Sequence, residues 1–167
     1  MTPPRVARIK PGPGQLSVWD FPRPPDLVQW HEAVTITLAG ELIAETTDAW
    51  CVLETSHPLT YYLPPTAFRD GSLQPADGTT FCEWKGTARY LDLVAGEWVA
   101  PRAGWTYPSP TARFAALRDH VAVYPAAMDA CTVDGVAVLP QPGGFYGGWV
   151  TPRVVGPFKG DPGTQGW

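Results

Sequence analysis

The middle of the chain carries the run Thr79-Thr80-Phe81-Cys82-Glu83-Trp84-Lys85-Gly86-Thr87-Ala88-Arg89-Tyr90. Its side chains alternate in the way that is typical of a β-strand, and residues 90–94 continue the pattern. Because successive side chains of a strand point to opposite faces, Glu83 and Lys85 would share one face and Cys82 and Trp84 the other. The alternative is a β-bulge at Lys85-Gly86, which would turn Lys85 into a pocket.

The segments on either side of this run also predict strands. Residues 34–38 and 41–45 flank Ala39-Gly40 as a hairpin, and Asp134-Gly135 marks a second hairpin within 130–139. One short helix is expected at 112–119, where Phe114 and Leu117 are three residues apart. Further strands are expected at 50–54, 59–63, 97–100 and 121–125. The predicted fold is mainly β, with compact antiparallel sheets, one short helix and an irregular C-terminal tail rich in proline and glycine.

The distribution of proline and glycine divides the 167 residues into three parts. Residues 1–25 are rich in proline, which lacks an amide donor and fixes φ, and they predict an extended N-terminal arm. Residues 26–139 predict a single core domain. Residues 140–167 mix glycine and proline with large aromatic side chains, whereas a flexible linker lacks such side chains. We therefore expect this tail to be packed on the core.

Composition excludes several classes of function. The chain has 12 basic and 16 acidic residues and a net charge of −4, with no basic cluster, so nucleic-acid binding is not expected. No apolar run approaches the roughly 20 residues that cross a bilayer, and the N-terminus does not resemble a signal peptide. The cysteines Cys51, Cys82 and Cys131 form no C-x-x-C pair, so no metal site is predicted. Reduced cysteines indicate a cytoplasmic protein.

The candidate catalytic residues are Lys85, Glu54, Cys82 and Tyr107. Lys85 is one of three lysines, and burial between Trp84 and Gly86 would lower its pKa and make it a base or an amine nucleophile. The alternative for Lys85 is an exposed ion pair with Glu83, which contributes about 0–1 kcal/mol. Cys82 is a candidate nucleophile, or else a small buried apolar residue without a catalytic role.

Glu54 closes an apolar run and is expected to lie among phenols. Burial would raise its pKa and suit it to general acid or base catalysis, although it could equally be a structural hydrogen-bond partner of buried tyrosines. The candidate substrate-binding residues are Tyr62, Trp84, Tyr90 and Trp105. A few polar groups among aromatic walls are the usual composition of a small-molecule site.

Five ordered motifs resemble one known family. They are Glu54-Thr55, Tyr61-Tyr62-x-Pro64, Cys82-x-Trp84-Lys85-Gly86-x-Ala88-x-Tyr90, Trp105-x-Tyr107-Pro108-x-Pro110 and Val121-x-Val123-Tyr124. Over residues 33–125 the sequence resembles the family called domain of unknown function 427, and some longer members are similar in the tail as well.

The resemblance implies a compact β-tent fold, similar to methionine sulfoxide reductase B and yippee-like domains. Those relatives often bind zinc with two C-x-x-C pairs, and this chain has neither pair. A nucleotidyltransferase label is attached to the family, but Gly71-Ser72 is followed by no D-x-D carboxylate pair.

Two functional hypotheses follow from the sequence. The first is a protein that binds or converts a small-molecule ligand in a polar and aromatic pocket. The second is a non-catalytic interaction module that uses the arm and the tail. A pocket predicts that Glu54 and Lys85 face one concavity with shifted pKa values, whereas a module predicts that both are exposed. The sequence specifies no cofactor, reaction or oligomeric state.

Overall fold

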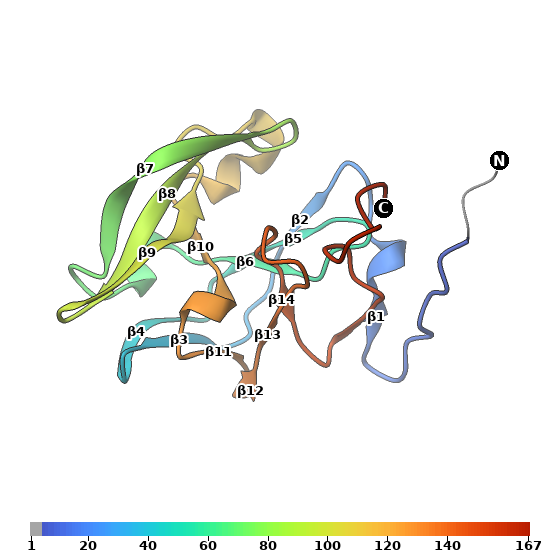
Figure 1. The fold of residues 1–167 in the computed structure, drawn as a ribbon, viewed down its shortest axis with the longest axis horizontal. Coiled ribbons are helices and arrows are strands. Elements are labelled where there is room, and N and C mark those ends of the chain that lie inside the picture. Colours follow the sequence, from blue (N-terminus) through green and yellow to red (C-terminus); the bar gives the residue numbers. More distant parts are fainter. Residues whose placement is uncertain (1–4) are drawn as a thin grey trace.

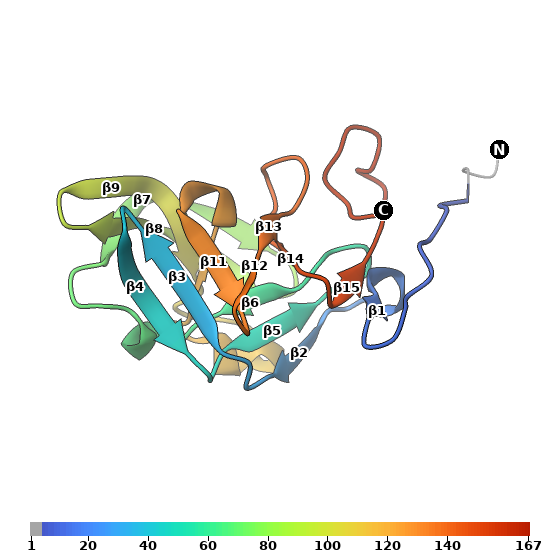
Figure 2. The same cartoon turned by 90° about the horizontal axis from the view of Figure 1, so that it is seen from below.

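The structure is a computed structural model that describes residues 5–167. Three antiparallel sheets make up most of it, and Figures 1 and 2 show them in two views. The first sheet has the order β10-β9-β8-β7, with Leu73–Cys82 (β7), Gly86–Ala95 (β8), Trp98–Thr106 (β9) and Val121–Val123 (β10). The second has the order β12-β11-β3-β4, with Val34–Leu38 (β3), Glu41–Thr46 (β4), Ala130–Val133 (β11) and Val136–Ala137 (β12). The third has the order β2-β5-β6, with Asp26–Gln29 (β2), Trp50–Leu53 (β5) and Thr60–Tyr62 (β6). The predicted mainly β fold is confirmed.

Short strands and short 3-10 segments complete the described chain. The short strands are Leu16–Ser17 (β1), Leu139–Pro140 (β13), Trp149–Val150 (β14) and Val154–Val155 (β15). The 3-10 turns are Val18–Asp20 (η1), Pro65–Ala67 (η2), Ala112–Leu117 (η3) and Pro125–Ala127 (η4). β13 pairs with β14, whereas β1 and β15 form a parallel pair that ties the arm to the tail.

Both predicted hairpins form where the turn residues favour them. Ala39 and Gly40 have φ values of 50° and 76°, and Asp134 and Gly135 have φ values of 48° and 79°. Two consecutive positive φ values are characteristic of the type I′ turn, whose twist matches that of the flanking strands. The predicted strand positions at β5, β6 and β10 are also confirmed.

The interpretation of residues 79–94 as one strand is wrong. The run folds back on itself as the β7–β8 hairpin, in which Cys82 pairs with Gly86 and residues 83–85 form the turn. Gly86 has a φ of 108°, in the region that L side chains rarely adopt. Thr111 holds the turn through hydrogen bonds from its amide to the Lys85 carbonyl (3.0 Å) and from its hydroxyl to the Trp84 carbonyl (2.6 Å). Lys85 is therefore redirected by a turn, not by a bulge.

The predicted helix at 112–119 is shorter and of another type. It is the 3-10 segment η3, and Phe114 inside it has non-helical φ and ψ values of −108° and 21°. Phe114 and Leu117 are both fully buried, and a spacing of three residues matches the three residues per turn of a 3-10 helix. The structure thus has four short 3-10 turns within residues 5–167, where one short helix was expected.

Tail residues contribute directly to the hydrophobic core. Trp149 is fully buried, stacks on Tyr61 with ring centroids 5.0 Å apart, and donates from its indole nitrogen to the Val123 carbonyl at 3.0 Å. In the arm, Val18 is fully buried and Phe21 is buried. Residues 1–4 of the expected arm lie outside the described residues. No helix in the described part of the chain is both long and apolar enough to cross a membrane.

Candidate functional site

A cavity of about 530 Å³ lies between the sheets and the tail. Its wall is formed by segments that are far apart in the sequence: the arm, the β5–β6 connection, the β7–β8 turn, the end of β9 and the tail. The structure brings all eight residues singled out from the sequence to this wall: Glu54, Tyr62, Cys82, Trp84, Lys85, Tyr90, Trp105 and Tyr107. Their catalytic or binding roles remain predictions.

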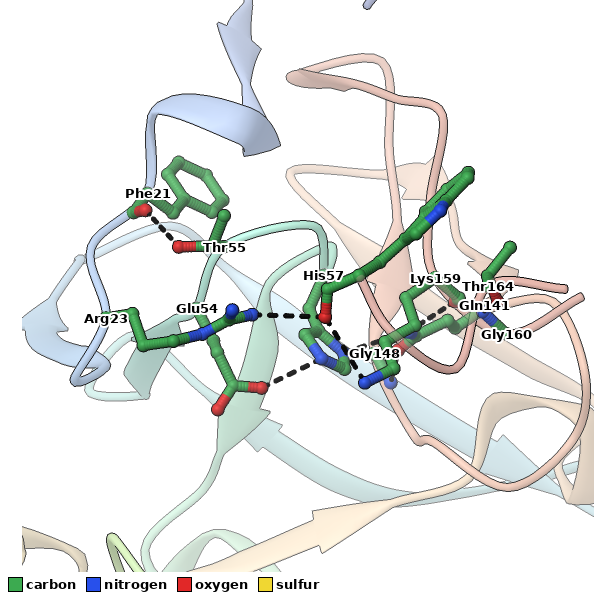
Figure 3. A network of polar contacts seen from close by, with 11 residues as sticks. Phe21, Arg23, Glu54, Thr55, His57, Gln141, Gly148, Lys159, Gly160 and Thr164 are labelled. Atoms are coloured by element: carbon green, nitrogen blue, oxygen red, sulfur yellow. Dashed lines mark hydrogen bonds and ion pairs between the residues drawn. The ribbon is translucent and has the colours of Figure 1, made fainter. Parts of the chain in front are cut away.

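Glu54 is the first of three side chains that are linked by hydrogen bonds (Figure 3). It follows β5, and the turn after it brings back His57, whose Nε2 lies 2.8 Å from Glu54 Oε2. The Nδ1 atom of His57 lies 3.0 Å from Nε2 of Gln141, a buried tail residue. The chain Glu54–His57–Gln141 therefore links the core to the tail.

The partners of Gln141 determine the hydrogen-bonding roles of the two ring nitrogens of His57. The side-chain oxygen of Gln141 accepts the Gly148 amide at 3.1 Å, and its Nε2 donates to the Lys159 carbonyl at 2.8 Å. These two backbone groups fix which end of the Gln141 amide is the nitrogen. That nitrogen faces His57 Nδ1, so Nδ1 is an acceptor and the ring proton is on Nε2, from which it is donated to Glu54. His57 thus links Glu54 to Gln141 and orients the carboxylate.

The expected direction of the Glu54 pKa is wrong. Burial does raise the pKa of Glu54, as the sequence suggested, but His57, through its hydrogen bond and its electrostatic interaction, and the charges of Lys85 and Arg23 outweigh burial and hold the pKa below its ordinary value. Lys85 and Arg23 come from other segments of the chain. Glu54 is consequently an ionised hydrogen-bond acceptor at neutral pH.

We expect the free energy of unfolding of Glu54→Gln to fall less steeply below pH 7 than that of the wild type. A carboxyl whose pKa is lower in the folded than in the unfolded state stabilises the protein above the unfolded pKa of about 4.3, and this stabilisation is lost as the pH falls through the folded pKa. Urea unfolding between pH 7 and pH 3 should therefore show a steeper loss for the wild type than for Glu54→Gln. Glu45→Gln, at an exposed position on β4, is the control and should parallel the wild type. Equal slopes for all three proteins would contradict this account.

Lys85 also differs from expectation. It is partly buried in the β7–β8 turn, and its Nζ lies 5.8 Å from the centre of the Tyr107 ring. Burial favours a lower pKa, but the neighbouring Tyr62, Cys82 and Glu54 outweigh it and raise the pKa of Lys85 above its ordinary value. The ammonium is therefore charged at neutral pH, which suits it to hold a negative group and not to act as a neutral amine.

Phenol and indole groups form the inner wall. Trp105 donates from its indole nitrogen to the Tyr62 hydroxyl at 3.2 Å, and the Tyr62 and Tyr107 rings lie 6.2 Å apart. Burial raises the pKa of Tyr107 far above its ordinary value, so its hydroxyl stays protonated. Behind Trp105 the tail backbone packs tightly, since a Cβ on Gly147 would lie 2.1 Å from the indole ring. The site thus offers a carboxylate, an ammonium and phenolic groups within an aromatic enclosure.

Comparison with protein families explains this concentration of motifs. The model of a family described as Domain of unknown function (DUF427) matches residues 26–134, about two thirds of the chain. The chain belongs to this family. A comparison with curated proteins finds no match. The DUF427 region contains the eight predicted residues and His57, whereas Arg23 and the tail wall lie outside the matched range.

The three cysteines, all within the DUF427 region, have different environments. Cys51 and Cys131 are buried, and burial raises the pKa of Cys131 to about 12, so neither is a ready nucleophile. Cys82 is partly buried on the cavity wall. His57 already has both ring nitrogens bonded, to Glu54 and Gln141, so it is not free to activate Cys82.

Several residues of the cavity wall were not predicted from the sequence. His57 has a recognisable signal, since it follows Glu54 by three residues across a turn that ends at Pro58. The others had none: Arg23, Gln141, Tyr146, Lys159 and Trp167 come from the arm and the tail, where only packing against the DUF427 region was expected. In residues 5–167, no three or more His, Cys, Asp or Glu side chains gather as they would to hold a metal ion.

Proposed function

We propose that the protein binds a small molecule in this cavity, with Glu54 and Lys85 as its principal polar contacts. The observation that carries the proposal is that these two side chains, opposite in charge and from separate elements, line one cavity. Its volume of about 530 Å³ is within the usual range of ligand sites, roughly 300–1,000 Å³. Tyr62, Trp84, Tyr90 and Trp105 would provide hydrogen bonds and aromatic contacts to the ligand.

The same groups support conversion of the ligand. Glu54, oriented by the His57 proton, would accept a proton or hydrogen bond from the ligand. The Lys85 ammonium and the Tyr107 hydroxyl would stabilise negative charge that develops on it. Cys82 remains the candidate nucleophile on the wall.

The interaction-module hypothesis has less support. It requires Glu54 and Lys85 to form ordinary surface pairs, whereas both are partly buried and have shifted pKa values. Exposed apolar side chains do occur at the mouth of the cavity, where Phe81 is 78% and Phe145 is 70% exposed. These rings would extend the ligand site outward. A cytoplasmic location fits the three free cysteines and belongs to the same proposal.

A thermal-shift screen against a broad metabolite library tests the proposal. We expect a metabolite that binds the wild type to add about 2.7 kcal/mol of stability at 100 times its Kd, and to lose this effect on Lys85→Ala. Lys10→Ala is the matched control, because Lys10 is exposed and does not line the cavity. If no metabolite raises the melting temperature of the wild type or the control, the result would count against the cavity as a ligand site. A metabolite that raises the melting temperature of Lys85→Ala as much as that of the wild type would count against it as well.

A further inference from the structure

Two cations from distant segments share one oxygen atom beside the cavity. Arg23 of the arm donates from Nη2 to the main-chain oxygen of Trp167 at 3.2 Å, and Lys159 of the tail donates from Nζ to the same oxygen at 3.4 Å. Both cations are labelled in Figure 3. All three residues line the cavity. This pair of cations therefore forms a site for an acceptor oxygen.

The charges around the cavity favour an anion. Arg23, Lys85 and Lys159 line the wall against the two carboxylates Glu54 and Glu83, although the whole chain has a net charge of −4. Two of the three lysines of the chain are present here. Glu54 is hydrogen-bonded to His57 and also interacts electrostatically with Lys85 and Arg23, so it offsets part of this positive charge. The charged side chains of the wall still include one more cation than anion, in a chain whose net charge is negative.

Trp167, which the two cations bind in the structure, indicates the shape of ligand that fits beside Arg23 and Lys159. Trp167 presents a main-chain oxygen to the cations, and its indole lies edge-on to Trp19 with ring centroids 5.1 Å apart. Trp19 is fixed in turn by a hydrogen bond from its indole nitrogen to the Pro157 carbonyl at 2.9 Å. Trp167 itself is only partly buried. The chain thus places an aromatic ring and a neighbouring main-chain oxygen beside the two cations. The Trp167 ring is held there by an edge contact with Trp19.

We propose that Arg23 and Lys159 form a carboxylate subsite, that Trp167 occupies it as an internal ligand, and that the cavity takes an aromatic carboxylate which displaces Trp167. This proposal rests on the proposed function and names the ligand class of the same site. The planar guanidinium of Arg23 matches the two oxygens of a carboxylate, and in the structure it contacts one main-chain oxygen of Trp167. The aromatic body of the ligand would lie along Tyr146 and Trp105.

The test compares two probes that differ only in charge, indole-3-acetate and indole-3-acetamide. Binding to the full chain is measured by titration in two-dimensional NMR, with the indole N–H signal of Trp167 as the reporter of displacement. We expect the acetate to bind at least about tenfold more tightly than the acetamide, because hydrogen bonds to charged groups are the stronger ones. Trp167→Ala should bind the acetate more tightly than the wild type, since the ring that holds the internal ligand is lost.

Two further variants separate the subsite from the cavity. Arg23→Gln should abolish the preference for acetate over acetamide, whereas Arg113→Gln, at an exposed position away from the cavity, should keep it. If both probes bind the cavity equally, or Arg23→Gln keeps the preference, the carboxylate subsite is refuted while small-molecule binding stands. If neither probe binds even to Trp167→Ala, the ligand class is wrong, and a metabolite hit that depends on Lys85 would still support the broader function.

Discussion

Trp149→Ala is expected to lower the free energy of unfolding by about 3–5 kcal/mol, the usual cost of removing a large aromatic side chain from a packed core. The side chain is fully buried, stacks on Tyr61 and donates to the Val123 carbonyl at 3.0 Å. Alanine would leave a cavity and an unpaired carbonyl. Urea unfolding followed by circular dichroism measures the loss.

The control for this variant is another tryptophan. Trp98 is 61% exposed on β9, and Trp98→Ala should stay within about 0.5 kcal/mol of the wild type. If Trp149→Ala were as stable as Trp98→Ala, the tail would not be part of the core, and the tail wall of the cavity would have no firm support.

Gln141→Leu is expected to cost about 2–5 kcal/mol, because it leaves several polar groups without partners in the interior. The side chain is buried and bonds to His57 Nδ1, the Lys159 carbonyl and the Gly148 amide. Each buried group left unsatisfied costs about 1–3 kcal/mol, partly offset by the apolar leucine. Chemical denaturation measures the stability.

A spectroscopic measurement tests the role of Gln141 more sharply. In ¹⁵N NMR the wild-type His57 ring should show Nε2 as the donor and Nδ1 as the acceptor, and Gln141→Leu should lose this fixed assignment. Gln29→Leu, at an exposed position on β2, is the control for stability and for the His57 signals. A Gln141→Leu protein with wild-type stability and an unchanged His57 spectrum would falsify the proposed orientation chain.

The fold was predictable where local turn chemistry and side-chain alternation agreed. Ala39-Gly40 and Asp134-Gly135 adopt the positive φ values that their residue types tolerate, so both hairpins were found. The turn at residues 83–85 was not found, because alternation continues through it and its Glu-Trp-Lys sequence contains no typical turn pair. Gly86 was the one available signal, and it also fitted a bulge.

The members of the candidate site were easier to predict than its electrostatics. Side-chain chemistry and motif spacing were enough to select eight residues that line one cavity. The pKa directions of Glu54 and Lys85 were not predictable, since each depends on neighbours that come from other segments. Gln141 and Lys159 were missed for the same reason: their function in the wall arises from contacts with residues far away in the sequence.

The parallel pairing of β1 with β15 has a consequence for the order of folding. It joins Leu16 to Val154 and Ser17 to Val155, near the two ends of the described chain. Contacts between residues so distant in sequence form slowly, because a long loop must close first, whereas the β3–β4 and β8–β9 hairpins are local and can form early. During synthesis the cavity cannot obtain the wall contributed by Gln141 and Lys159 until these residues have left the ribosome. The proposed ligand site is therefore completed after most of the β-structure, and in a refolding experiment the binding of a probe to this site should lag behind strand formation.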